Sequence, residues 1–148
     1  MKFAFNPSVQ SLYTGRLSAH PRVEIHDATL TPAAVAIVVA KSAANDEACF
    51  LLTRRAKGLT RHSGQYALPG GRLEPDESTK TAALRELQEE LGLTASTNQV
   101  VGQLDDFPTR SGFRITPVAV WLEQDTNTAL DPNEVEEVFS VPVRDLIH

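Results

Sequence analysis

The chain has 148 residues, of which 41% are hydrophobic and 6% are aromatic, a composition typical of a single soluble α/β domain with a proper core. Fourteen basic and nineteen acidic residues give a formal net charge of −5, which argues against nucleic-acid binding driven by the charge of the whole chain. No apolar run approaches the length of a transmembrane helix, so we expect no membrane partner.

Residues 1–30 form an N-terminal extension with few signals. Pro7, Gly15 and Pro21 divide it into short pieces. We expect a short helix over residues 9–17, followed by a strand that approaches the domain.

Two buried strands are predicted next. The run AAVAIVVA at 33–40 is continuously apolar and rich in β-branched residues, as in a strand that is buried on both faces. Residues 41–47 form a polar turn, and ACFLLT at 48–53 predicts a second strand paired with the first. Cys49 lies in this apolar run and is interpreted as a core residue. A single cysteine permits no intrachain disulfide and, with no signal peptide visible, favours the reducing cytoplasm.

Residues 54–70 are predicted to be a loop, because glycine and proline recur along them. The segment is also basic in an acidic chain. Guanidinium groups bind phosphate oxygens in a bidentate manner, so the loop is a candidate phosphate-binding segment; the alternative is a solvated basic loop. The basic residues are Arg54, Arg55, Lys57, Arg61 and His62.

A helix is predicted between Asp76 and Gly92. Asp76 is the expected N-cap, and Gly92 stands where a residue of positive φ ends a helix. At 100° per residue, Leu84, Leu87 and Leu91 form one apolar stripe that docks on the core.

Three carboxylates crowd another face of this helix. Glu86, Glu89 and Glu90 are neighbours at spacings of three and four residues, and Arg85 offsets only part of their charge. A hard divalent cation with oxygen ligands, Mg²⁺ or Mn²⁺, is a natural partner for such a cluster. The alternative is an ordinary solvated acidic face.

The last third of the chain is predicted to form strands separated by turns. Strands are predicted over 100–107 and 113–122, with a turn at 108–112 between them. A final strand with alternating faces is predicted over 132–141, and Pro142 is expected to start a short helix.

The stretch from Gly71 to Leu93 resembles the Nudix box, G-x5-E-x7-R-E-U-x-E-E-x-G-U, where U is a bulky aliphatic residue. Every fixed position of the box is matched, namely by Gly71, Glu77, Arg85, Glu86, Leu87, Glu89, Glu90, Gly92 and Leu93. The resemblance implies an α/β/α sandwich over residues 31–148, with a mixed sheet on which the loop and helix of the box pack. It also implies metal-dependent hydrolysis of a nucleoside diphosphate linked to another group.

The resemblance also implies roles for the matching residues. Glu86 and Glu90 are expected to be the principal metal ligands, and Glu89 a further ligand or the base that activates water. The carbonyl of Gly71 would complete the metal shell, and backbone N–H groups near Gly70 and Gly71 would contact the phosphates. Glu77 and Arg85 are expected to pair and hold the loop against the helix. In some members the base comes from a later loop, for which the alternatives are Glu123, Asp125, Glu134 and Glu136.

The segment before the box resembles the coenzyme A pyrophosphatase branch, L-L-T-x-R-[SA]-x3-R-x3-G-x3-F-P-G-G. Arg55 and Arg61 are the candidate substrate-binding residues. Thr60 stands where the branch has arginine, and Leu68 where it has phenylalanine. The expected substrate is a small nucleotide, coenzyme A or a derivative, for a cytoplasmic monomer or homodimer. ADP-ribose or a dinucleotide is the first alternative, and a catalytically silent binding module is the second.

Overall fold

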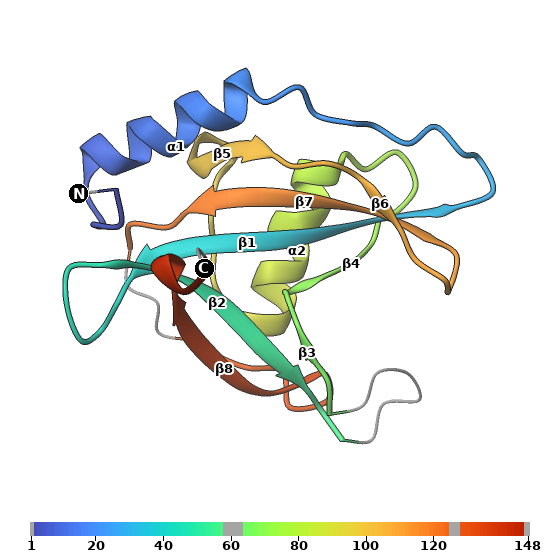
Figure 1. The fold of residues 1–148 in the computed structure, drawn as a ribbon. Helices are drawn as coiled ribbons and strands as arrows, with labels where there is room; N and C mark the ends of the chain where they lie inside the picture. Colours follow the sequence, from blue (N-terminus) through green and yellow to red (C-terminus); the bar gives the residue numbers. More distant parts are fainter. Residues whose placement is uncertain (1, 58–63, 125–127, 147–148) are drawn as a thin grey trace.

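The computed structural model describes residues 2–57, 64–124 and 128–146 (Figure 1). No helix within these residues is long and apolar enough to cross a membrane. The described residues form two α-helices, eight strands and two short 3₁₀ helices. In order, they are α1 Pro7–Ala19, β1 Thr31–Lys41, β2 Ala48–Arg55, β3 Tyr66–Ala67, β4 Gly70–Arg72, α2 Thr79–Leu91, η1 Thr97–Gln99, β5 Val100–Gln103, β6 Phe107–Pro108, β7 Phe113–Trp121, β8 Val135–Pro142 and η2 Val143–Leu146.

The strands form one mixed sheet with β1 near its centre. The hydrogen-bonded order is β3-β2-β1-β7-β5, and β4, β6 and β8 pair with β1, β7 and β2 respectively. β1 and β7 are parallel, whereas the other pairs are antiparallel. The strands predicted at 33–40, 48–53 and 113–122 are thereby confirmed.

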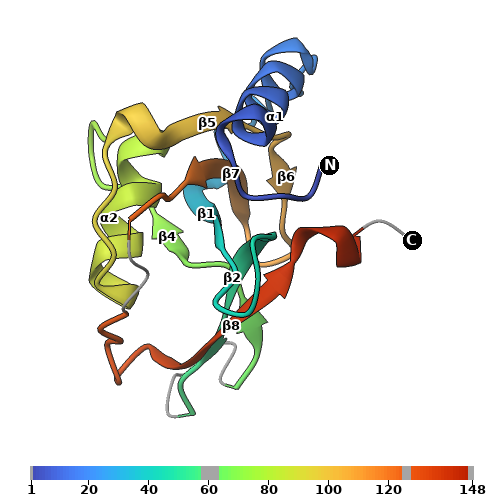
Figure 2. The same ribbon diagram turned by 90° about the vertical axis from the view of Figure 1, so that its left-hand side faces the viewer.

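Helix α2 covers one face of this sheet, and α1 lies on the other side (Figure 2). Ala34, Ala36 and Val38 alternate along β1, and all three side chains are buried in the same core as Leu87 and Leu91 of α2. The small alanines let the helix approach the sheet closely. The α/β/α arrangement expected from the sequence is confirmed.

The N-terminal segment packs on the opposite face around Trp121. Phe5 stacks on the Trp121 ring at 4.4 Å, and Tyr13 meets it edge-on at 5.8 Å. The helix predicted over 9–17 is confirmed as α1, which begins at Pro7, a favourable first position. The expectation that Gly15 breaks the chain is wrong, because Gly15 lies inside this helix.

Residues 20–30 form no approach strand, contrary to expectation, and hydrogen bonds to aspartates hold them instead. The Asp106 carboxylate accepts bonds from Ile25 N at 3.0 Å, Arg22 Nη1 at 2.9 Å and Thr116 Oγ1 at 2.6 Å. Burial alone would raise the pKa of Asp106, but these bonds outweigh it and lower the pKa. The single strand expected over 100–107 is split, because residues 104–106 belong to neither β5 nor β6.

Three other boundaries differ from expectation. The loop predicted over 54–70 contains the short strand β3, which pairs with β2, and its last residue begins β4, which pairs with β1. The last strand begins at Val135 and includes Pro142, which was expected to open the terminal helix. That helix is the 3₁₀ turn η2, which follows β8 directly.

Candidate active site

Local backbone geometry sets where helix α2 starts and ends. Ser78 is the N-cap, and its hydroxyl accepts a bond from Thr81 N at 3.2 Å. The prediction of Asp76 as N-cap is wrong, because Asp76 lies two residues earlier in a turn with φ of 63°. Gly92 ends the helix with φ of 70°, as predicted.

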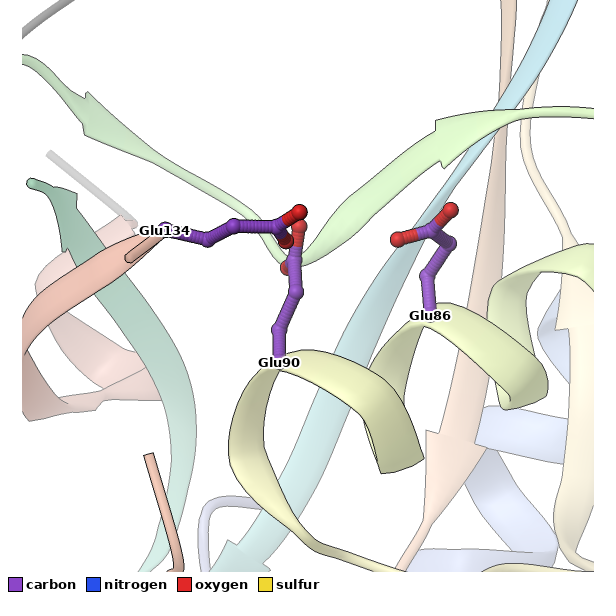
Figure 3. Close-up of side chains that lie close together, drawn as sticks. All are labelled: Glu86, Glu90 and Glu134. Carbon is purple, nitrogen blue, oxygen red and sulfur yellow. The ribbon is translucent and has the colours of Figure 1, made fainter. Parts of the chain in front are cut away.

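Three carboxylates converge beside the β3–β4 connection, as Figure 3 shows. Glu86, Glu90 and Glu134 each offer an oxygen atom, and these oxygens lie within 4.8 Å of one another. Glu86 and Glu90 are one helical turn apart on α2, whereas Glu134 lies just before β8. The cluster therefore joins two segments that are distant in the sequence.

Backbone bonds hold the Glu134 segment against the end of α2. Ala129 N donates to Leu91 O at 2.8 Å, and Asp131 N donates to Glu90 O at 3.0 Å. Asp131 O then accepts from Glu134 N at 3.0 Å. These bonds place Glu134 by the fold of the backbone, before any ion binds.

The cluster is electrostatically unfavourable without a cation. Burial raises the pKa of Glu90 to about 8, and the charge of Glu86 adds to this effect, while the N–H of Gly70 and the charge of Arg55 oppose it. Glu90 is only 4% exposed. Burial also raises the pKa of Glu86. Converging carboxylate oxygens are the hard ligands that Mg²⁺ and Mn²⁺ prefer, so this donor set fits such an ion.

Gly70 and Gly71 of β4 approach the carboxylates closely. Gly70 N donates to Glu90 Oε2 at 3.2 Å. A Cβ atom on Gly71 would lie 2.5 Å from Glu86 Oε1, and one on Gly70 would lie 2.7 Å from Val35 Cα. Backbone leaves no room for a side chain at Gly70, and a side chain at Gly71 would displace the Glu86 carboxylate, which explains the glycine pair that was predicted to contact ligands here.

Arg85 binds several carboxylates at once. Its Nε and Nη2 atoms donate to Glu77 at 2.8 and 2.9 Å, and Nη1 donates to Glu86 at 2.9 Å and to Glu89 at 3.2 Å. Nη2 also donates to Arg72 O at 3.0 Å, which ties β4 to the helix. The hydrogen bonds from Arg85 lower the pKa of Glu77. The expected pairing of Glu77 with Arg85 is therefore present.

The structure does not bring Glu89 into the cluster. Its side chain is 51% exposed and is bonded to Arg85. Among the alternatives for the base, Glu134 joins the cluster, Glu136 lies 3.5 Å from Arg54, and Asp125 is outside the described residues. Glu123 lines a separate hollow of about 540 Å³ beside the 41–46 turn. The sequence offered no signal that singled out Glu134.

A cleft of about 420 Å³ opens next to the carboxylates. Arg55, Gly70 and Gly71 line it, together with residues of β1, β3 and β7. The Nε atom of Arg55 is buried and has no hydrogen-bond partner within the described residues. Leu68 also lines the cleft, whereas Thr60 and Arg61 lie outside the described residues.

Comparison with known proteins agrees with this geometry. The NUDIX domain family model matches residues 30–148. Nudix hydrolase 3 of Caenorhabditis elegans is 31% identical over 134 residues, 88% of this chain and 55% of that protein. Nudix hydrolase NudL of Yersinia enterocolitica is 39% identical over 98 residues, 66% of this chain and 50% of that protein.

The chain thus spans about half the length of these curated relatives. Among solved structures, the MutT protein from Methanosarcina mazei Go1 has a TM-score of 0.61 at 22% identity, covering 87% of this chain and 84% of that one. At 22% identity this similarity shows the fold alone. Since the family model covers most of the chain, the protein belongs to the Nudix family.

Proposed function

We propose that this protein hydrolyses a diphosphate bond in a nucleoside diphosphate derivative, with Mg²⁺ or Mn²⁺ as cofactor. The observation that carries the proposal is the convergence of Glu86, Glu90 and Glu134 beside the cleft. Glu90 is buried and Glu86 is partly buried, so holding their charges beside that of Glu134 is costly unless a cation occupies the cluster. Membership of the Nudix family supports the same activity.

Within this proposal each carboxylate has a task. Glu86 and Glu90 would hold the cation, and Glu134 would serve as a third ligand or as the base for the attacking water. A divalent cation bound there supplies Lewis acidity towards the phosphate oxygens and lowers the pKa of a bound water. Arg85 orients Glu86, and Gly70 N orients Glu90. Glu89, the base expected from the sequence, lies on the solvent side of Arg85.

Coenzyme A or a derivative is the proposed substrate. The support is the signature residues before the box, of which Arg55 and Gly70 line the cleft. Leu68, which departs from that signature, lines the same cleft, so ADP-ribose or a dinucleotide is the specific alternative. A silent binding module is disfavoured because every box carboxylate is present.

A hydrolysis panel tests both the reaction and the substrate. Coenzyme A, acetyl-CoA, 3′-dephospho-CoA, ADP-ribose, NADH and diadenosine polyphosphates would each be offered with Mg²⁺ or Mn²⁺, and the products separated by chromatography. We expect the highest kcat/KM with coenzyme A. A preference for ADP-ribose or a dinucleotide would move the protein to the alternative, and no cleavage of any compound would refute the proposed reaction.

Replacing Arg55 by Ala is expected to raise KM for the best substrate by about ten- to a hundredfold, with a smaller effect on kcat. The reason is that an arginine that only binds phosphate contributes on the order of one charged hydrogen bond, about 1.5–3 kcal/mol. Steady-state kinetics would separate the two constants. Arg54→Ala is the matched control, because Arg54 is paired with Glu137 at 2.6 Å and does not line the cleft. An unchanged KM in the Arg55 variant would exclude a substrate contact.

A further inference from the structure

The cleft extends from Gly70 and Gly71, which lie against Glu90 and Glu86, onto a partly exposed part of the sheet. Its floor contains Ala33 and Val35 of β1, and Ile115 of β7. Val35 and Ile115 are only partly buried, unlike the residues of β1 that face α2. This part of the cleft offers apolar surface within reach of the diphosphate site.

An arginine and an aromatic ring stand at one wall of this surface. The Arg72 guanidinium lies over the Phe113 ring, with Cζ at 5.2 Å from the ring centroid. Arg72 is exposed, and no ion pair or side-chain hydrogen bond engages its guanidinium in the part of the chain that the structure describes. Within the described residues, the cation–π contact with Phe113 is the interaction that this guanidinium makes.

A second aromatic ring lines the same cleft. Tyr66 of β3 is 59% exposed, although it is a large aromatic residue. Its ring contacts Phe139 at 5.6 Å in a tilted arrangement, which restricts its motion without covering it. An exposed, held ring in a cleft offers a contact surface to a flat ligand.

We propose that Arg72, supported by Phe113, and the Tyr66 ring form a subsite for the flat base of the nucleotide substrate. Nucleobases stack on aromatic rings and on guanidinium planes, and the apolar floor suits the edge of such a base. The inference rests on the proposed function, because it takes the diphosphate to lie at Glu86 and Glu90. It makes Arg72, Phe113 and Tyr66 specificity-determining residues and leaves the chemistry to the carboxylates.

A contact between Arg72 and phosphate is the competing role, and the two roles differ in what lysine can replace. Lysine keeps the charge that a phosphate needs but lacks the plane on which a base stacks. Arg72→Lys should therefore behave like Arg72→Ala if the residue stacks a base. If the residue binds phosphate, lysine should retain most of the affinity.

Binding of AMP and of ribose 5-phosphate by the Mg²⁺-loaded protein tests the subsite, because the two ligands differ only in the base. Isothermal titration calorimetry would give the ratio of their Kd values. We expect wild type to favour AMP by about tenfold or more, the order of one base stack. Arg72→Ala, Arg72→Lys, Phe113→Leu and Tyr66→Leu should each lower that ratio several-fold, whereas Tyr66→Phe should keep it. Arg110→Ala is the matched control, because Arg110 is exposed on the adjoining turn and does not line the cleft.

Three results would overturn the subsite: equal or absent binding of the two ligands by wild type, an unchanged ratio in Arg72→Lys, or equal weakening of both ligands by Arg72→Ala. The proposed function fails separately. A protein that prefers AMP but cleaves nothing in the panel keeps the subsite and loses the reaction. A protein that cleaves nucleotides but binds AMP and ribose 5-phosphate equally keeps the reaction and loses the subsite.

Discussion

Replacing Glu90 by Gln is expected to lower kcat by on the order of a thousandfold or more while leaving the fold intact. The substitution keeps the shape of the side chain and the acceptor for Gly70 N, but it removes a charge from the cluster with Glu86 and Glu134. Glu90 is buried, so no solvent molecule or flexible neighbour would easily replace it in its proposed role as a metal ligand. Turnover with saturating Mg²⁺ is the direct measurement.

The stability of this variant gives a second readout. Burial raises the pKa of Glu90 to about 8, above the ordinary value of 4.5, so ionisation costs stability as the pH rises from 4.5 to 8. Glutamine does not ionise. In EDTA at pH 8, Glu90→Gln should therefore melt at or above the temperature of wild type. A variant that is inactive because it is unfolded would melt far lower.

A matched control, and two variants that discriminate between the candidate bases, complete the test of Glu90→Gln. Glu137→Gln makes the same change on β8, at an exposed residue paired with Arg54, and should leave turnover nearly unchanged. Glu89→Gln and Glu134→Gln decide which carboxylate is the base. A large loss in Glu134→Gln with a small loss in Glu89→Gln supports the spatial cluster. The opposite result would restore the role that the box resemblance implies for Glu89.

Most of the long helices and strands were predictable because burial and hydrophobic periodicity are visible in the local sequence. The apolar run at 33–40 became β1, and the leucine spacing after residue 78 became α2. The N-cap was missed because Asp76 and Ser78 both carry suitable oxygens. The bond from Thr81 N to the Ser78 hydroxyl and the positive φ of Asp76 assign the cap to Ser78.

The parts that were not predictable depend on contacts between distant segments. Strands β3 and β4 have only two and three residues, too few for a periodic pattern. Glu134 joins the cluster because backbone bonds to the end of α2 carry its segment there. No local property distinguishes Glu134 from Glu136 two residues later, which is ion-paired with Arg54. The glutamates of the helix were predictable because their spacing is itself the signal.

Replacing Arg85 by Ala is expected to lower both stability and activity, because one guanidinium holds the loop, the helix and β4 together. Glu77 is only 9% exposed and receives two bonds from Arg85. Removing the Arg85 guanidinium leaves the nearly buried Glu77 carboxylate without its partner, which costs roughly 2–4 kcal/mol of unfolding free energy. Glu86 also loses the bond that orients it, so we expect kcat/KM to fall by about a hundredfold.

The pH dependence of the loss of stability in Arg85→Ala identifies the cause of that loss. Arg85 lowers the pKa of Glu77 from 4.5, so the stabilisation is present above pH 4.5 and is lost as the pH falls through the lowered folded value. The difference in unfolding free energy between wild type and Arg85→Ala should therefore shrink in acid, as denaturant titrations at several pH values would show. A difference that stays constant into acid would mean that the side chain acts by packing.

A double-mutant cycle then separates the effect of the Glu77–Arg85 pair on stability from the effect of Arg85 on Glu86, the proposed metal ligand. If Glu77 and Arg85 act as one unit, Glu77→Gln in the Arg85→Ala background should cost little further stability. Arg85→Lys keeps one charge but cannot bridge Glu77 and Glu86 with a planar fork, so intermediate stability is expected. If the lysine variant regains stability but not turnover, the orientation of Glu86 is what catalysis requires from Arg85. Full recovery of both would reduce the role of Arg85 to its charge.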